Sequence, residues 1–269
     1  MPTLLIFGLG YLGAAVARQA EAAGWAVEAT SRDPARGLID PADSAALREA
    51  VVGADAVLVT AAPTPTGCPG HQALGPILAS HRPGWVGYVS STGVYGDRGG
   101  GWVFEDSALN AASIAGARRV AAEQVWTDEG AHLFRLPAIY GPGRSTVDRL
   151  REGTARRVRK PGQVFNRIHV EDAAAGVLAS IVRPRPGRAY NLADDDPSSQ
   201  EEVLLAAAAR MNLPPPPETD INDPSVSEAM RGFYLDSKRV SNARAKAELG
   251  WRPRYPTWRE GLEALLSQA

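Results

Sequence analysis

A glycine motif near the start of the chain has the spacing of a phosphate-binding loop. Gly8-Leu9-Gly10-Tyr11-Leu12-Gly13 follows an apolar run and opens an alanine-rich stretch with helical spacing. In such a GxGxxG turn the first glycine permits the tight turn, the second lets a pyrophosphate approach the backbone, and the third allows close packing of helix on strand. The pyrophosphate then lies at the positive N-terminus of the helix. The motif predicts a dinucleotide site; the alternative is a glycine-rich turn without a ligand.

The residues after the next apolar run, 25–30, indicate whether the site prefers NAD or NADP. An acidic residue about 20 positions beyond the glycines would bind a ribose 2′-hydroxyl, whereas an arginine would accept a 2′-phosphate. Asp33 has a suitable spacing, but Ser31 and Arg32 precede it and offer a hydroxyl and a guanidinium. A guanidinium forms strong charge-assisted hydrogen bonds with phosphate. We therefore expect NADP, with NAD as the alternative if Arg32 is only a solvated loop residue.

Alternating strands and helices must position these residues. Apolar runs at 4–7, 25–30, 55–60, 85–90 and 132–136 alternate with helical patterns at 11–23, 42–51, 72–81 and 108–129. Continuously apolar strands separated by helices indicate a parallel sheet covered on both faces. The expected fold class is α/β, with a doubly wound parallel Rossmann sheet.

The pattern changes after residue 142. A strand is expected at 189–192, and helices are expected over 170–182, 241–249 and 257–267. A further helix should begin at a capping box formed by Ser198 and Glu201 and end at Met211. The sequence predicts a dinucleotide-binding domain over residues 1–142 and a small C-terminal substrate-binding lobe over residues 143–269, with residues 165–192 returning to the Rossmann sheet.

Two further segments suggest contacts with a substrate. The basic residues between Asp148 and Lys160 offer either a grip on a substrate diphosphate or, as is usual for such a run, a solvated helix face. Gly99-Gly100-Gly101 predicts a flexible loop over the site that could act as a lid.

Composition excludes several classes of partner. Among 269 residues, 29 Lys and Arg against 30 Asp and Glu give a net charge of −1, so no global field favours nucleic acid or an anionic membrane. The single cysteine, Cys68, excludes an internal disulfide and fits a reducing compartment, and the four histidines lack metal-ligand spacing. Residues 3–17 are too few to span a bilayer. We expect a cytoplasmic protein with a small-molecule substrate and no metal, nucleic-acid partner or membrane partner.

Five segments, in order along the chain, carry a resemblance to a known family. They are VSSTGVYGD at 89–97, RLPAIYGPG at 135–143, RIHVEDAA at 167–174, AYNL at 189–192 and ELGWRP at 248–253. The first is similar to the family's catalytic-serine strand end, and the others to its RLxxxYGPG, xIHVxDxA, YNxx and LGWxP segments. The chain thus resembles, over nearly its whole length, the extended and atypical short-chain dehydrogenases/reductases of the NAD(P)-dependent epimerase/dehydratase superfamily.

The Tyr-x-x-x-Lys pair of this family is absent. Where the family commonly reads YGRSKLAAEQ, this chain reads AGARRVAAEQ, so that Ala115 stands at the tyrosine position and Arg119 at the lysine position. In the family the tyrosine is the acid/base, and the lysine lowers its pKa and holds the ribose. Alanine transfers no proton, while an arginine can still hydrogen-bond a ribose but does not titrate. This departure resembles the atypical subgroup of the superfamily.

The resemblance also implies roles for individual residues. Ser91 would hydrogen-bond a substrate carbonyl, and Tyr95 and Tyr140 are the phenols that could replace the missing acid. Together with Arg119 these are the candidate catalytic residues. The implied cofactor contacts are Gly8, Gly10, Tyr11, Leu12, Gly13, Ser31, Arg32, Ala61, Ala62, Arg119 and Pro137.

Three functions stay open at this point. The first is an NADP-dependent oxidoreductase or epimerase-like enzyme acting on a carbonyl or alcohol, with a nucleotide sugar as one candidate substrate. The second is a catalytically inactive NADP-binding sensor or regulatory protein, and the third an enzyme that uses the fold for non-redox chemistry. The resemblance further implies a homodimer formed through the helical stretch at residues 108–126.

Overall fold

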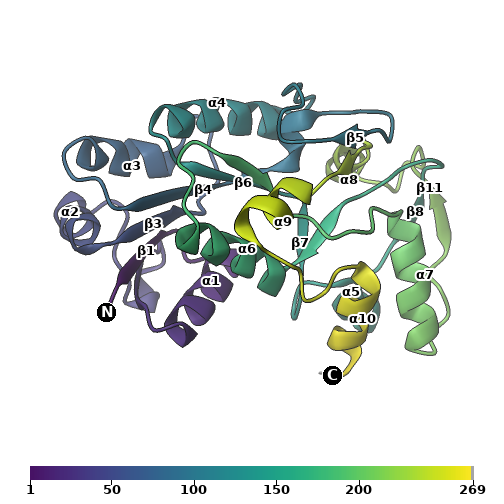
Figure 1. The fold of residues 1–269 in the computed structure, drawn as a ribbon. Coiled ribbons are helices and arrows are strands. Elements are labelled where there is room, and N and C mark those ends of the chain that lie inside the picture. Colours follow the sequence, from purple (N-terminus) through teal and green to yellow (C-terminus); the bar gives the residue numbers. More distant parts are fainter. Residues whose placement is uncertain (268–269) are drawn as a thin grey trace.

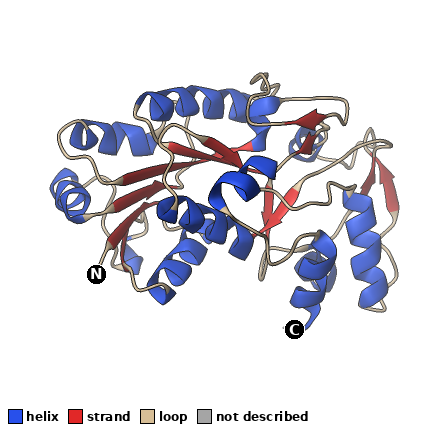
Figure 2. Cartoon of the chain, viewed as in Figure 1, coloured by secondary structure: helices blue, strands red, loops and turns tan. Residues whose placement is uncertain are grey.

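A central parallel sheet with helices on both faces dominates the computed structural model, which describes residues 1–267 (Figures 1 and 2). The strand order is β10-β6-β4-β3-β1-β2, and neighbouring strands run parallel. The strands are β1 (Thr3–Phe7), β2 (Ala26–Ala29), β3 (Ala56–Val59), β4 (Trp85–Ser91), β6 (His132–Leu136) and β10 (Ala189–Asn191). This arrangement confirms the expected doubly wound α/β fold.

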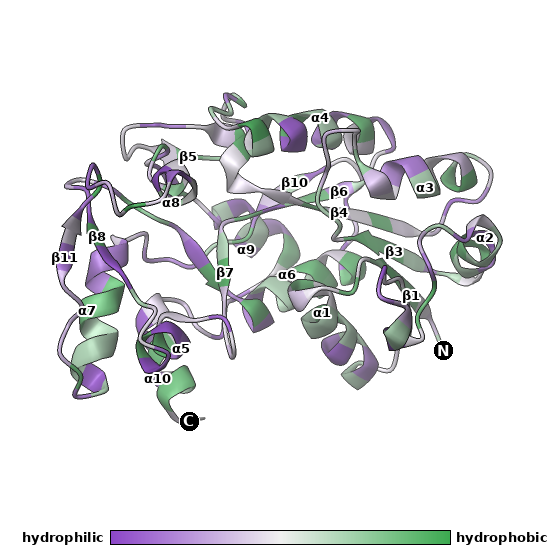
Figure 3. Cartoon of the chain, turned by 180° about the vertical axis from the view of Figure 1, so that it is seen from behind, coloured by the Kyte–Doolittle hydropathy of each residue, from purple (hydrophilic) through white to green (hydrophobic). Residues whose placement is uncertain are grey.

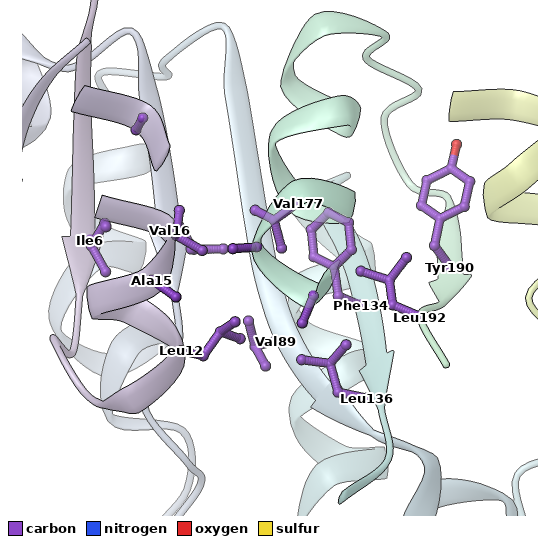
Figure 4. Packing of buried hydrophobic residues seen from close by; sticks show 14 of the residues in the cluster. Ile6, Leu12, Ala15, Val16, Val89, Phe134, Leu136, Val177, Tyr190 and Leu192 are labelled. Atoms are coloured by element: carbon purple, nitrogen blue, oxygen red, sulfur yellow. The ribbon is translucent and has the colours of Figure 1, made fainter. Parts of the chain in front are cut away.

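Two helical layers bury the two faces of this sheet. One face is covered by α1 (Tyr11–Ala22) and α6 (Val170–Val182), and the other by α2 (Ser44–Gly53), α3 (Pro69–Leu78) and α4 (Ile114–Asp128). Alternate residues of each strand enter opposite cores. In Figure 4, side chains of α1, among them Leu12 and Val16, face Val177 of α6. Burial on both faces explains why the strands are continuously apolar.

The second lobe is built from short elements. They are β7 (Ala138–Tyr140), α5 (Thr146–Arg151), β8 (Arg157–Arg159), β9 (Arg167–His169), α7 (Gln200–Arg210), β11 (Glu218–Asp220), α8 (Glu228–Phe233) and α10 (Trp258–Ser267). Three other short elements lie against the main sheet: β5 (Trp102–Val103) and β12 (Arg239–Val240) pack beside Tyr95, and α9 (Ala243–Leu249) packs on α6 and β10. Strands pair as β7–β9, β8–β11 and β5–β12, and α5, α7 and α10 share a separate apolar core. In Figure 3, β3 is coloured hydrophobic and β11 hydrophilic, as expected for a central and a peripheral strand.

The chain passes between the lobe and the main sheet. After β9 has paired with β7, α6 packs on α1 and β10 joins the edge of the main sheet beside β6. No helix within residues 1–267 is both long and apolar enough to cross a membrane.

Two expected helix starts are wrong. The helix α4 begins six residues later than position 108, because the Ser113 side chain caps it by accepting from Gly116 N at 3.0 Å. The helix α7 is capped by Ser199, which accepts from Glu202 N at 3.0 Å, and not by Ser198. The Ser198 hydroxyl instead accepts from Arg167 at 2.6 Å. A tertiary hydrogen bond therefore removes Ser198 from the cap of α7, whereas the start of α4 is set by the local cap at Ser113.

Candidate functional site

The glycine loop between β1 and α1 is held by hydroxyl groups from the two neighbouring strands. Gly8 N donates to Thr30 Oγ1 at 3.0 Å, and the Thr60 hydroxyl donates to the Gly8 carbonyl. Leu9 N also donates to the Thr30 carbonyl at 3.0 Å. Sequence reasoning missed both threonines as contacts of the loop, although each is the last residue of a predicted strand. They keep the loop at the carboxyl edge of the sheet, where open α/β sheets bind ligands.

The three glycines of the loop have different reasons to be glycine. Gly8 has a φ of +102°, and a Cβ at Gly13 would lie 2.8 Å from the Gly8 carbonyl oxygen, so the fold itself requires these two. A Cβ at Gly10 would meet no atom within 4 Å, and Gly10 has an ordinary φ of −88°. Nothing in the described chain therefore requires a glycine at position 10.

The helix that follows begins without a cap. Gly10 provides no side-chain hydrogen bond, and the first turn of α1 contains no acidic residue. The first N–H groups of a helix have no intrahelical acceptor, and together they carry a partial positive charge. An anion placed above Gly10 would satisfy them.

The residues after β2 form a short 3₁₀ turn, η1 (Pro34–Arg36), beside this loop. Asp33 caps the turn by accepting from Ala35 N at 3.0 Å, and Ser31 Oγ accepts from Asp33 N at 3.1 Å. Arg32 is exposed. The turn returns Arg36 to the glycine loop, where its guanidinium donates to the Leu9 carbonyl at 2.6 Å. Sequence reasoning missed Arg36, whose only sign was a second basic residue shortly after Arg32.

Other implied cofactor residues lie along the same edge. Ala61 borders the loop, because a Cβ at Gly8 would lie 3.2 Å from Ala61 N. Ala62 follows it and is exposed, and Pro137 is half-buried between β6 and β7. The Leu12 side chain is buried in the core, so only its backbone can face a ligand.

Ser91 is the last residue of β4, and Arg119 of α4 contacts the same strand. Ser91 is half-buried and caps a 3₁₀ turn, η2 (Thr92–Tyr95), by accepting from Gly93 N at 3.1 Å. Arg119 donates to the Val89 carbonyl at 2.6 Å and to the Tyr88 hydroxyl at 3.1 Å. Burial raises the pKa of Tyr88 to about 12, with Arg119 opposing the shift. Ala115 is exposed in the first turn of α4 and leaves this corner without a phenol at the family position.

Tyr95, expected as a substitute acid, is a structural residue. Its side chain is fully buried, and its hydroxyl donates to Asn191 Oδ1 at 2.7 Å while accepting from Arg135 at 2.9 Å. Burial raises the pKa of Tyr95, and the hydrogen bonds from Arg135 oppose that shift only in part. The phenol therefore has neither access to a substrate nor a free proton to deliver.

Tyr140, the second expected substitute, is also turned away from solvent. Its hydroxyl is buried without a hydrogen-bond partner among residues 1–267, and it fills the space that a side chain at Gly261 of α10 would need. Burial raises the pKa of Tyr140 far above its ordinary value. The burial of both phenols was not foreseen, because spacing along the sequence places a residue near an edge but does not reveal whether its side chain points outward. Their role as acids stays a prediction that this burial disfavours.

The basic run does not form a free patch. Arg157 and Arg159 form ion pairs with Glu201 and Glu218 at 2.5–3.0 Å. Arg156 and Lys160 donate to backbone carbonyls, of Ser225 and Tyr234 respectively. Most of the run is therefore committed to contacts within the second lobe.

The glycine loop at 99–101 is anchored, contrary to the expected flexible lid. Arg98 N and Gly100 N each donate to the Ser237 carbonyl at 2.9 Å, and Arg239 N donates to the Gly101 carbonyl at 2.8 Å. Because β5 then pairs with β12, this segment ties the two parts of the fold together.

Cys68 and His169 both have structural environments. Cys68 is buried, and its Sγ accepts from Trp126 Nε1 at 3.3 Å. His169 caps α6 by accepting from Glu171 N at 3.3 Å, and burial lowers its pKa to about 4. No group of three or more His, Cys, Asp or Glu residues suited to a metal ion occurs in the described part of the chain.

Solved structures with this fold cover nearly the whole chain. A functionally unknown conserved protein from Silicibacter pomeroyi is 40% identical, covers 100% of this chain and 99% of its own, and has a TM-score of 0.90. A protein from Methylobacillus flagellatus named as an NAD-dependent epimerase/dehydratase is 25% identical, with coverages of 99% and 98% and a TM-score of 0.75. The human epimerase family protein SDR39U1, solved with NADPH, is 16% identical, with coverages of 99% and 100% and a TM-score of 0.81.

The fold, the glycine loop and these relatives agree. No model of a protein family matches the sequence, and no curated protein matches it either. The chain has the fold of a structure named as an NAD-dependent epimerase/dehydratase, which agrees with the resemblance drawn from its motifs, and it shares this fold over its whole length with the 40% identical protein. Within that frame it carries Ala115 and Arg119 where the family has its tyrosine and lysine.

Proposed function

We propose that the chain binds NADP(H) and acts as an oxidoreductase or epimerase-like enzyme on a carbonyl or alcohol. The observation that carries this proposal is Gly10, a glycine that the fold does not need, at the uncapped start of α1. A diphosphate needs this combination, since it must approach the backbone closely and be met by free N–H groups. The human relative solved with NADPH supports a nicotinamide dinucleotide as the ligand.

The preference for NADP rests on the turn after β2. Asp33, the residue that would bind a ribose 2′-hydroxyl, already accepts from Ala35 N at 3.0 Å. Arg32 and Arg36 are exposed beside the loop and form no ion pair within residues 1–267. Two guanidinium groups near one ribose favour the ligand that carries the 2′-phosphate.

The protein's own part in the chemistry is binding and orientation. A nicotinamide dinucleotide, when bound, supplies or accepts a hydride. Ser91 would hydrogen-bond a substrate oxygen at the end of β4, and Arg119 would hold the ribose from α4. With Ala115 at the tyrosine position and Tyr95 and Tyr140 buried, no phenol among the candidates delivers a proton. The proton must then come from the substrate or from water, and turnover on ordinary epimerase and dehydratase substrates should be weak or absent.

A matched pair of glycine variants tests the site. Gly10→Ala places a methyl group where the diphosphate would lie, and overpacking of about 1–3 kcal/mol corresponds to roughly 5- to 150-fold weaker NADPH binding by calorimetry. Gly53→Ala is the control, because a Cβ there also meets no atom within 4 Å but lies far along the chain in α2. Equal NADPH affinity in Gly10→Ala, Gly53→Ala and the unaltered chain would overturn the proposal.

A second pair of variants tests the choice of cofactor. Arg36→Ala and Arg32→Ala should each weaken NADPH binding and leave NADH binding unchanged. A charge-assisted contact of about 1.5–3 kcal/mol corresponds to roughly 10- to 100-fold. If the unaltered chain binds NADH as tightly as NADPH, the assignment passes to NAD.

A non-catalytic sensor is the second candidate, favoured by the exposed alanine at position 115. It predicts tight NADPH binding without NADPH oxidation in the presence of nucleotide sugars or small carbonyl compounds. The same assay with Ser91→Ala separates the two functions, because only an enzyme loses turnover. The homodimer stays a prediction: Ile114 at the start of α4 is 73% exposed, and light scattering at high concentration checks it.

A further inference from the structure

The first turn of the second lobe returns to the glycine loop. Tyr11, the first residue of α1, donates from its hydroxyl to the Pro142 carbonyl at 3.1 Å. This approach needs the glycine before Pro142, because a Cβ at Gly141 would lie 2.5 Å from the Tyr11 hydroxyl oxygen. The turn closes through Arg144 N, which donates to the Gly141 carbonyl at 3.0 Å. The turn and the start of α1 are therefore in direct contact.

This turn places a guanidinium beside the ring of Tyr11, the first residue of α1. The Arg144 Cζ lies 5.6 Å from the centre of the Tyr11 ring, within the range of a cation–π contact. Arg144 is exposed and forms no ion pair with an acidic side chain in the part of the chain that the structure describes. A second guanidinium, that of Arg36, lies on the other side of the loop at the Leu9 carbonyl.

The two carboxylates whose charges raise the pKa of Tyr11, Asp148 and Glu171, form hydrogen bonds with residues other than Arg144. Asp148 accepts from Ser145 N at 2.8 Å and from Ser145 Oγ at 2.6 Å in the capping box of α5. Glu171 accepts from Arg18 and Gln19, each at 2.7 Å. Cations are disfavoured at the N-terminus of a helix, which is itself positive. An anion between the Arg144 guanidinium and the first turn of α1 would be attracted by both.

We infer that Arg144 binds the diphosphate of the dinucleotide and presses it against the first turn of α1 from the side of the second lobe. The inference rests on the proposed function, because it needs a dinucleotide on the glycine loop. Arg144 directly precedes Ser145, the N-cap of α5. A bound diphosphate would thus fix the start of α5, and cofactor binding would position the lobe expected to hold the substrate.

Calorimetry with NADPH and NADH tests this role. Loss of one exposed charge-assisted contact in Arg144→Ala should weaken both dinucleotides by the same factor, about tenfold. Equal loss is the distinguishing result, because both ligands carry the diphosphate whereas only NADPH carries the 2′-phosphate. Arg144→Lys should recover part of the affinity, and Arg151→Ala, an exposed arginine of α5, should leave it unchanged.

Each other outcome has a definite meaning. Unchanged affinity in Arg144→Ala overturns the inference, as does a loss confined to NADPH, which would assign Arg144 to the 2′-phosphate. If the unaltered chain binds neither dinucleotide, the proposed function fails and this inference with it. Circular dichroism verifies that the variants fold, and Arg144→Gln, which keeps the length of the side chain without its charge, must repeat the loss.

Discussion

Two corners of one sheet edge have opposite characters. At the end of β1, the glycine loop leaves helix N–H groups uncapped, and Gly10 faces open space. At the end of β4, polar groups satisfy one another: Arg135 donates to Glu123, to the Tyr95 hydroxyl and to the Glu105 carbonyl at 2.7–3.2 Å. The first corner therefore has N–H groups free to bind a ligand, whereas most polar groups of the second corner already have hydrogen-bond partners.

Whether a polar group is already paired is a better guide to a functional site than the type of residue that carries it. A buried polar group that is already paired is structural, because extracting it would leave its partner unsatisfied. A polar group left free at a surface costs little and can bind. Tyr95 has the chemistry of an acid, but its hydroxyl is buried and already paired. The backbone around Gly10 offers no side-chain chemistry, but its N–H groups are free to bind.

The largest expected effect is a loss of unfolding free energy when the buried pair of Glu123 and Arg135 is broken. Glu123→Ala leaves the Arg135 guanidinium buried without its carboxylate, and the side chains of this pair are only 4% and 7% exposed. Breaking such a buried pair costs about 3–5 kcal/mol of unfolding free energy, measured by urea denaturation. Glu263→Ala is the control, because its pair with Arg210 is exposed and should be worth about 0–1 kcal/mol. Similar losses in the two variants would remove the contrast between the corners.

A smaller effect on the free energy of unfolding should appear when the pH is changed, through His169 at the start of α6, the helix that packs on α1. Burial lowers the pKa of His169 to about 4, so the folded state binds this proton less readily than the unfolded chain, in which the pKa is about 6.5. The stabilisation is present above about pH 6.5 and is lost as the pH falls toward 4, by about 3 kcal/mol in all.

Urea unfolding at pH 7 and at pH 4.5 measures this loss. His169→Asn keeps a side-chain oxygen for the cap of α6 and removes the titrating ring, so its stability should fall less over the same range. His81→Asn, at an exposed position, serves as the control and should retain the full slope. A His169→Asn protein with an unchanged slope would show that other groups cause the acid sensitivity.

The smallest effects compare the two tyrosines. Tyr95→Phe leaves Asn191 and Arg135 without their shared hydroxyl and should cost about 1–3 kcal/mol of unfolding free energy. Tyr140→Phe removes a hydroxyl without a partner among the described residues, so stability should stay the same or rise slightly. Neither change should alter NADPH binding or any NADPH oxidation. Loss of turnover in a Tyr140→Phe protein of unchanged cofactor affinity would restore that phenol as the acid.

Much of the fold follows from local pattern. The six strands of the main sheet and the helices α1, α6 and α9 lie close to where apolar runs and helical spacing predict them. The short strands of the second lobe, such as β8 and β11, were not predicted, because pairs of three residues carry too little pattern to stand out. The late start of α4 was also missed, because helical spacing before Ser113 does not show that the Ser113 side chain caps the helix.

The sequence by itself determined the glycine loop, the resemblance to the epimerase/dehydratase superfamily and the alanine at position 115, because each depends on residue type at fixed spacing. Only the tertiary structure decided which polar side chains are free. Arg36 and Arg144 come to the loop from segments 23 and 131 residues beyond Gly13, and Tyr95 meets an asparagine 96 residues away. Such pairings follow from how strands and turns stack at one edge of a sheet, and no short-range pattern encodes them.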